Sequence, residues 1–390
     1  MREAELEQRG NQIKERVLER LDLSRELSDE EVLDVIDEVI LESSKERYLG
    51  LAEKKQLQKA LFDTMRRLDI LQELVDDPEI TEIMINGTSH IFVERNGKLT
   101  KWDKRFSSKQ KLEDIIQQMV SFSNRAVSKA HPIVDARLPD GARVNVVLDP
   151  VALDGPVITI RRFPQQPITM EQLVAWGSVT KEMVEYLRKA VIAGKNIFIS
   201  GGTGSGKTTF LNALSQFIPE QERVITIEDN AELQIRHVVN LVRLEVRMAN
   251  TEGTGEITIR DLIRTALRMR PDRIIVGEVR GSEAVDMLQA MNTGHDGSLS
   301  TGHANSTADM LSRLEMMVLM SLEIPLEAIR RQIASAIDLF VHLGRMPDGS
   351  RKVLEVTEVR GYEHGVIQMQ PLFRYEPEQE AATGKGRKIP

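Results

Sequence analysis

The feature that most constrains the fold of this chain is a glycine-rich octapeptide at Gly201–Thr208, with the sequence GGTGSGKT. It matches the pattern G-x-x-x-x-G-K-[ST] at every position. The apolar run Asn196–Ser200 precedes it, and the helix-patterned run TTFLNALSQFI follows from Thr208. A strand pattern, the glycine-rich loop and a helix pattern follow one another directly in the sequence. This order predicts a phosphate-binding loop rather than a glycine-rich turn with a surface lysine.

The residue types of this loop suit a bound triphosphate. Glycines allow successive backbone N–H groups to converge on phosphate oxygens, and the start of the helix adds its positive dipole end. Lys207 can reach the β- and γ-phosphates, and the Thr208 hydroxyl can ligate magnesium. We therefore expect ATP and Mg²⁺, with Thr208 as metal ligand and a binding set of Gly201, Gly202, Thr203, Gly204, Ser205, Gly206, Lys207, Thr208 and Thr209.

Composition places the chain among ordinary globular proteins, with 41% hydrophobic and 29% charged residues in 390. There is no cysteine, which excludes disulfides and thiolate metal sites. The charged N-terminus lacks a signal-peptide core, and no apolar run approaches the roughly 18–20 residues that span a bilayer. We expect a cytoplasmic protein. The net charge of −8 disfavours broad nucleic-acid binding, although a local basic channel would escape this test.

The first 165 residues show two patterns. Residues 1–70 are charged and helix-patterned, with a capping box at Ser28-Asp29-Glu30-Glu31 and a second amphipathic stretch from about Lys55 to Leu74, so a small helical bundle is expected. Residues 71–165 read as a small α+β domain. Its signals are a hairpin at Asn96-Gly97, a helix near Lys109–Asn124, a strand pair around Asp140-Gly141 and the strand VITIRRF.

Residues 166–375 alternate helical patterns with short apolar strands, which predicts an α/β domain with a mostly parallel sheet. The predicted strands are NIFIS, RVITIE, HVVNLV, RIIVGE and a run near Leu339–Leu343. The segment Phe163–Ile168 contains two prolines and reads as the linker between domains. Residues 376–390 have almost no large apolar side chains and are predicted to be a disordered tail.

Two of the predicted strands end in acids, at Glu228-Asp229 and at Glu278. A bound triphosphate needs a carboxylate to position and activate water, and strand carboxyl ends lie beside the loop. One such acid alone is more often a turn residue or helix cap; two favour function, with Glu278 the better base. The ending Val276-Gly277-Glu278 lacks an aspartate for magnesium, so metal binding falls to Thr208 and water, with Glu228 or Asp229 as further candidates.

The small, polar segment Leu299–Ser306 contains one histidine, His303, which could sense the γ-phosphate or a neighbouring acid. A lone histidine near glycine is more often a satisfied turn residue. For the same reason we give His295 no role.

Taken in order, these motifs resemble those of the type II/type IV secretion ATPases, and most of all the CpaF-type ATPases of tight-adherence (Flp/Tad) pili. The resemblance covers roughly residues 70–375. It implies a RecA-like P-loop domain at 166–375, a PAS-like α+β domain at 71–165 and an N-terminal helical region at 1–70. It rests on GGTGSGKTT at 201–209, TIEDNAEL at 226–233, LRMRPDRIIVGEVRG at 267–281 and SLSTGHANS at 298–306.

The resemblance also implies residue roles. Glu278 is then the catalytic glutamate of an atypical Walker B motif, whose Val-Gly-Glu ending is the family's own. Glu228 is the acid of the aspartate box, and His303 belongs to the histidine box. Family members are hexameric rings that hold nucleotide between a variable N-terminal domain and the RecA-like domain.

That arrangement makes the arginines of the preceding domain candidates for contacts with the nucleotide. A well-placed arginine can raise the rate of phosphoryl transfer by a factor of roughly 10³–10⁵. The resemblance places arginine fingers there, and we rank Arg137 and Arg143 first. Arg161 and Arg162 are expected near the base or ribose. For any single arginine, a solvated basic edge is an equal alternative. Further candidates, with structural roles as the alternative, are Arg243, Arg268 and Arg270.

The expected function is a hexameric ATPase motor that assembles, or retracts, a tight-adherence pilus. Domain closure about Phe163–Ile168 would drive inner-membrane platform proteins, with no direct nucleic-acid contact and with the N-terminal helices docking on the platform or a polar-localisation partner. The alternative is a type IV secretion ATPase that translocates protein or DNA. A nucleotide-gated binding module, in which hydrolysis is incidental, is disfavoured because it would lack a catalytic base, whereas Glu278 is present. A transport-cassette ATPase is disfavoured because no LSGGQ-like signature occurs, and a small-molecule kinase because nothing resembles a lid.

Overall fold

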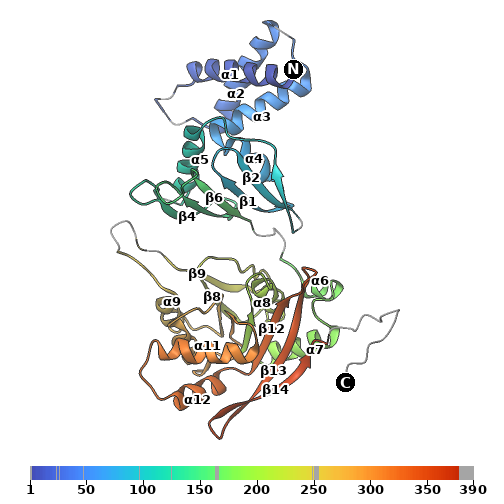
Figure 1. The fold of residues 1–390 in the computed structure, drawn as a ribbon, viewed down its shortest axis with the longest axis vertical. Coiled ribbons are helices and arrows are strands. Elements are labelled where there is room, and N and C mark those ends of the chain that lie inside the picture. The colour runs from blue at the N-terminus through green and yellow to red at the C-terminus, as the bar shows by residue number, and fades with distance from the viewer. Residues whose placement is uncertain are drawn as a thin grey trace, which may run out of the picture. The chain divides into compact units, whose positions relative to one another are not determined.

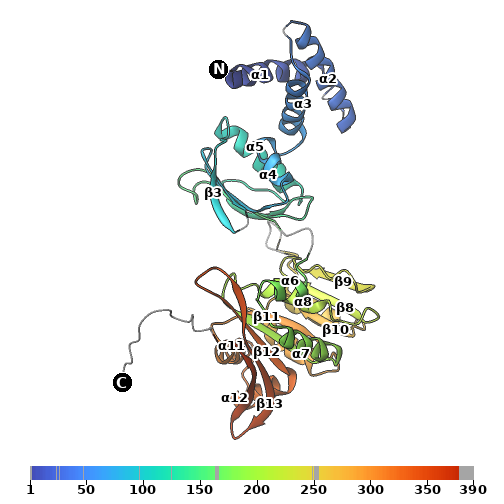
Figure 2. The same ribbon diagram turned by 90° about the vertical axis from the view of Figure 1, so that its right-hand side faces the viewer.

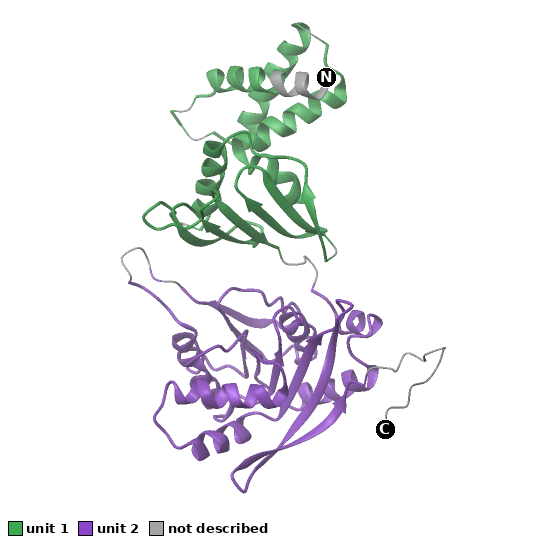
Figure 3. Ribbon diagram, in the orientation of Figure 1, with its two compact units in different colours: residues 1–165 green, residues 166–390 purple. Residues whose placement is uncertain are grey.

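The computed structural model describes residues 2–376 except 23, 26, 47, 96, 124, 163–166, 248 and 250–253. The chain forms two compact units, residues 1–165 and 166–390 (Figure 3). Most of the predicted linker Phe163–Ile168, and all but the first residue of the predicted tail at 376–390, lie outside the described residues. Within the described residues, no helix has both the length and the apolar character needed to cross a membrane.

The N-terminal helices of unit 1 pack around their own apolar core, which includes Val17, Ile36 and Leu61. The predicted capping box is confirmed: the Ser28 N–H donates to the Glu31 carboxylate at 2.8 Å, and the Glu31 N–H donates to Ser28 Oγ at 3.2 Å. The helix predicted from about Lys55 to Leu74 instead stops at Arg66, and short turns follow it. The elements are α1 (Arg2–Arg20), α2 (Asp29–Glu46), α3 (Leu51–Arg66), η1 (Asp69–Leu71) and α4 (Gln72–Asp76).

The rest of unit 1 is an antiparallel sheet in the order β3-β2-β1-β6-β5-β4, with one face covered by α5 (Lys109–Ser121) (Figure 1). Its hairpins turn at Gly97 and Gly141, whose φ angles are +75° and +92°, as the predicted turns require. Asn96 itself lies outside the described residues. The strands are β1 (Ile80–Asn86), β2 (His90–Arg95), β3 (Lys98–Trp102), β4 (Ile133–Arg137), β5 (Arg143–Val147) and β6 (Val157–Arg161).

Unit 2 contains one sheet in the order β14-β13-β12-β7-β11-β10-β8-β9. The strands from β12 to β9 run parallel, and β13 and β14 extend the β12 edge as antiparallel strands. Figure 2 shows the sheet with helices on both faces. The strands are β7 (Ile197–Gly201), β8 (Arg223–Glu228), β9 (Asn240–Glu245), β10 (Arg273–Val276), β11 (Leu299–His303), β12 (Leu339–Arg345), β13 (Arg351–Glu363) and β14 (Val366–Arg374).

Two apolar cores, one on each face, sandwich this sheet. Neighbouring residues of β7 alternate between them: Phe198 packs with α9 to α12, whereas Ile197 and Ile199 pack with α6 to α8. This double burial explains why β7, β8 and β10 contain nearly continuous apolar runs in the sequence. The helices are α6 (Met170–Ala175), α7 (Lys181–Ile192), α8 (Lys207–Ser215), α9 (Ile259–Ala266), α10 (Glu283–Met291), α11 (Thr307–Leu319) and α12 (Leu326–Ala336).

Two features of this sheet were not anticipated from the sequence. The segment Leu299–His303, noted only as small and polar, is the central strand β11, where small side chains fit between β7 and β10. The hairpin β13–β14 was also missed, since its alternating pattern is typical of antiparallel rather than parallel strands.

The strand that leads to Glu278 is anchored at its other end by a buried ion pair. Arg273, at the start of β10, is 2% exposed and pairs with Glu222, and its Nη1 also donates to the carbonyl oxygen of Val191 at 2.7 Å. We expect Glu222→Ala to lower the free energy of unfolding of unit 2 by about 2 kcal/mol, because it leaves a buried cation without its partner. Urea unfolding measures this loss.

The control for that measurement is Glu220→Ala, an exposed acid on the same segment. Its effect should stay within about 0.5 kcal/mol. Equal effects of the two substitutions would show that the ion pair does not stabilise the unit.

Candidate active site

The predicted phosphate loop joins β7 to α8 at the carboxyl edge of the parallel sheet. Gly204 and Gly206 have φ angles of +71° and +92°, which favour glycine. A Cβ on Gly201 would lie 2.5 Å from both the Leu343 carbonyl oxygen and Ser205 Oγ, whereas one on Gly202 would meet open space. Gly204 and Gly206 therefore allow the tight turn, Gly201 allows the loop to pack closely against β12 and Ser205, and Gly202 borders open space.

Lys207 is buried at the start of α8 and points back into the loop. Its Nζ donates to the carbonyl oxygens of Gly201 and Gly202 at 3.1 and 3.0 Å, and to His303 Nδ1 at 3.2 Å. Burial lowers the pKa of Lys207, although the charge of Glu278 works to raise it. A desolvated cation beside a helix N-terminus fits a phosphate group, which would supply the counter-charge that neutral carbonyls do not.

His303 lies opposite Gly201 in the parallel register of β11 and β7, which explains why it meets Lys207. An ammonium group can only donate, so Nδ1 accepts and the ring proton is on Nε2. Nε2 lies 2.9 Å from Glu278 Oε1. Burial and the Lys207 charge lower the pKa of His303, so the ring is neutral at neutral pH.

Glu278 follows β10, and its carboxylate lies between two nitrogen groups. Oε1 faces His303, and Oε2 accepts a hydrogen bond from Arg280 Nη2 at 2.9 Å. Burial alone would raise the pKa of Glu278, but the hydrogen bond and charge of Arg280, helped by His303 and Lys207, outweigh it and lower the pKa. Glu278 is therefore an ionised carboxylate two contacts away from the loop lysine.

Glu228, in contrast, is turned inward and is 3% exposed. Its Oε2 accepts the backbone N–H groups of Glu232 and Leu233 at 2.8 and 2.9 Å, while Oε1 is buried without a hydrogen-bond partner among the described residues. Burial raises the pKa of Glu228 to about 7, partly opposed by those two N–H groups. In this structure Glu228 orders the segment after β8, and its catalytic role stays a prediction.

The predicted metal ligand Thr208 occupies the first turn of α8, next to Lys207. A hydroxyl at this position, beside a loop with room for phosphate oxygens, suits Mg²⁺, which prefers oxygen ligands and retains several waters. Among the described residues no group of three or more His, Cys, Asp or Glu side chains is placed to hold a metal ion.

The arginines of unit 1 form a row that the sequence spacing does not reveal. Arg137 of β4 pairs with Arg143 of β5, and Arg143 pairs with Arg161 of β6. Residues directly opposite share a face of the sheet, and like charges there destabilise it unless an anion compensates. Arg162 is mostly buried, and its Nη1 donates to the carbonyl oxygens of Asp77 and Ile80. The roles of all four toward a nucleotide remain predictions.

The remaining candidate arginines lie apart from the loop within unit 2, and so does His295, to which we give no role. Arg268 and Arg270 precede β10, and His295 precedes β11, so all three lie toward the amino edge of the sheet. Arg243 is on the outermost strand, β9. None of the four is brought beside Lys207.

Sequence reasoning missed Arg280, which contacts the predicted base directly. A signal was present, because residues two apart in an extended segment point the same way and Arg280 follows Glu278 by two. The buried contact between Ser200 Oγ and His342 Nδ1, at 2.9 Å, was also missed, since it joins strands 142 residues apart.

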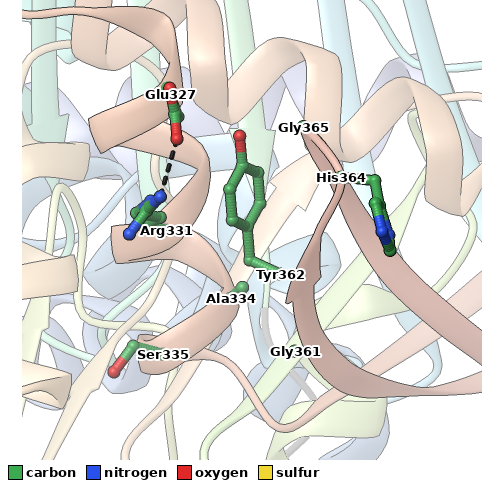
Figure 4. Close-up of a pocket in the computed structure, with 8 residues that line it drawn as sticks. All are labelled: Glu327, Arg331, Ala334, Ser335, Gly361, Tyr362, His364 and Gly365. Carbon is green, nitrogen blue, oxygen red and sulfur yellow. Dashed lines mark hydrogen bonds and ion pairs between the residues drawn. The ribbon is translucent and has the colours of Figure 1, made fainter.

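A pocket lies away from the phosphate loop, between α12 and the turn that joins β13 to β14 (Figure 4). Glu327 and Arg331 pair along α12 at 2.7 Å, and the Arg331 guanidinium lies 5.4 Å from the centre of the Tyr362 ring. None of these residues contributes to the phosphate loop. The lining residues are Glu327, Arg331, Ala334, Ser335, Gly361, Tyr362, His364 and Gly365.

Residues 65–371 match the family described as "Type II/IV secretion system protein". The chain belongs to this family. It is 33% identical to the conjugal transfer protein TrbB of Rhizobium radiobacter, over 80% of this chain and 94% of TrbB. It is also 33% identical to the type IV secretion system protein PtlH of Bordetella pertussis, over 71% of this chain and 89% of PtlH.

Among solved structures, the ATPase DotB of Legionella pneumophila is similar in fold, with a TM-score of 0.53 and 24% identity over 75% of this chain and 80% of DotB. Together with the parallel sheet and its loop, this confirms the predicted fold class for this secretion family member. That class is a RecA-like P-loop domain joined to a small α+β domain and N-terminal helices.

The raised pKa of Glu228 makes a prediction about stability. Its folded pKa of about 7 lies above its unfolded value, so its contribution is fully present below about pH 4.5 and is lost as the pH rises through 7. Glu228→Gln keeps the acceptor oxygen but does not ionise. We expect the nucleotide-free variant to be more stable than wild type at pH 8, by about 2–3 kcal/mol, and similar to it near pH 5. Urea unfolding at both pH values measures this difference.

The matched control is Glu220→Gln, which makes the same substitution at an exposed glutamate. Parallel pH profiles for wild type and the Glu228 variant would contradict a buried, weakly acidic Glu228.

Proposed function

We propose that this chain is an ATP-hydrolysing motor of a type IV secretion apparatus that drives the translocation of protein or DNA. The observation that carries the proposal is the contact chain from Lys207 through His303 to the ionised carboxylate of Glu278. The names of its relatives support the choice of apparatus, since TrbB is a conjugal transfer protein and PtlH a type IV secretion protein.

Lys207, His303 and Glu278 each have a distinct task in hydrolysis. The loop N–H groups and Lys207 bind the phosphates, and Thr208 would hold magnesium. Magnesium, when bound, neutralises charge on the phosphate oxygens. Glu278 accepts a proton from the attacking water, and neutral His303 orients that carboxylate while receiving the Lys207 hydrogen bond.

We further propose that the chain works as a homo-hexamer associated with the inner membrane through platform proteins of the apparatus. The net charge of −8 favours action on protein partners over direct nucleic-acid contact. Native mass spectrometry with a non-hydrolysable ATP analogue tests the ring, and a fully active monomer would refute it.

A second candidate is assembly or retraction of a tight-adherence pilus, because the ordered motifs at 201–209, 226–233, 267–281 and 298–306 resemble those of CpaF-type ATPases. Deleting the gene separates the candidates. Loss of conjugation or protein secretion with normal pili supports the first, whereas loss of pili alone supports the second.

Lys207→Ala and Glu278→Gln should separate binding from chemistry. The first removes the buried cation and should abolish tight ATP binding. The second keeps the shape but not the basicity of the side chain, so binding should persist while turnover falls at least about 100-fold. Fluorescent-nucleotide titration and phosphate release measure the two effects. Full turnover by the Glu278 variant would remove its assignment as base.

The row of arginines gives a further test. We expect Arg137→Ala and Arg143→Ala each to spare nucleotide binding by the monomer and to reduce turnover by roughly 10³-fold if they stabilise transition-state charge. Arg125→Ala, in the same unit, is the matched control and should keep its turnover. If Arg137→Ala and Arg143→Ala both keep wild-type turnover, these arginines have a structural role and no role in catalysis.

A further inference from the structure

The segment that carries Glu278 is held by backbone hydrogen bonds on both sides. The Gly277 N–H donates to the Ile227 carbonyl oxygen of β8, and the Val279 N–H donates to the Thr301 carbonyl oxygen of β11, both at 2.8 Å. The N–H groups of Arg280 and Gly281 then donate to Glu283 Oε1 at 2.6 and 2.9 Å. These hydrogen bonds fix the backbone of Arg280 and therefore the position from which its side chain extends.

The side chain of Arg280 connects two acids from different strands. Its Nη2 donates to Glu278 Oε2 at 2.9 Å, and its Nη1 lies 3.4 Å from Asp229 Oδ2, just past the end of β8. Arg280 is 64% exposed, whereas the Glu278 side chain is 20% exposed. A largely solvated guanidinium therefore reaches inward to a carboxylate that is mostly covered, with Asp229 on its other side.

Such an arrangement restricts the Glu278 side chain. Oε2 accepts a hydrogen bond from Arg280, whereas Oε1 lies 2.9 Å from His303 Nε2 but has no hydrogen-bond partner among the described residues, so the bond from Arg280 is what orients the carboxylate. A guanidinium suits this task because its planar fork can bond two carboxylates at fixed angles, which a lysine ammonium cannot. A misplacement of a catalytic group by about 1 Å can cost on the order of 10²-fold in rate.

We propose that Arg280 is the positioning residue for Glu278: anchored by Asp229, it holds the carboxylate in the orientation in which it accepts the proton from water. Arg280 acts through Glu278, so its loss should affect turnover and not the binding of nucleotide. This inference rests on the proposed ATPase function and adds to it a residue outside the predicted site.

The test is a double-mutant cycle in which kcat and KM are measured by steady-state phosphate release. Arg280→Ala should lower kcat about 10- to 100-fold with KM for ATP within about twofold, since binding groups are untouched. Arg280→Lys should recover part of that loss. Combining Arg280→Ala with Glu278→Gln should be no slower than Glu278→Gln alone, because the positioned group is already gone.

Several outcomes would overturn the inference. They are full kcat in Arg280→Ala, a raised KM with unchanged kcat, or a double variant slower than Glu278→Gln by the whole factor of the single substitution. Arg280→Gln repeats the test with a polar side chain, and thermal unfolding checks that each variant folds. Arg188→Ala, which breaks an exposed ion pair with Glu185 on α7, is the matched control and should keep both constants.

Failure of the inference can be told apart from failure of the proposed function. If wild type and Lys207→Ala release phosphate equally slowly, the ATPase function itself fails. If wild type turns over and Glu278→Gln does not, while Arg280→Ala is fully active, the function stands and only the positioning role is lost.

Discussion

The candidate site depends on the parallel hydrogen-bond ladder of unit 2. β7, β11, β10 and β8 run side by side in the same direction, so their carboxyl ends meet at one edge of the sheet. The register places His303 directly opposite Gly201. Because both faces of these strands are buried, a one-residue slip in register would exchange side chains between the two cores and disrupt the packing of both, so the same burial that stabilises the sheet also fixes the positions of the site residues.

At that edge, the charges are arranged in order from a buried cation to an exposed one. Lys207 is desolvated and contacts a neutral histidine, which faces the ionised Glu278, and Arg280 lies on the solvent side. Burial explains why Lys207 and His303 have lowered pKa values, and the arginine explains why Glu278 does too. The two acids therefore differ: Glu278 is charged and its side chain is 20% exposed, while Glu228 has a raised pKa and accepts hydrogen bonds from backbone N–H groups.

Membership of the type II/IV secretion family agrees with this geometry, since the match covers residues 65–371 and so includes every one of these side chains. The helices α1 and α2 lie outside the match. They share an apolar core with α3, which contributes Leu57, Leu61 and Phe62 to it.

By itself the sequence determined the strand–loop–helix at Gly201–Thr208, the capping box at Ser28 and the hairpin turn at Gly141. Through the order of its helix and strand patterns it also determined the fold class. Each of these depends on residues close together in the chain, whose φ angles and hydrogen bonds follow from residue type. Only the tertiary structure decided that Leu299–His303 is a central strand, that Glu228 points inward and that Arg280 bonds Glu278. These depend on which strands become neighbours and which side of each is buried. Packing between segments distant in the sequence sets both, and the sequence carried a local signal only for Arg280, which follows Glu278 by two in an extended segment.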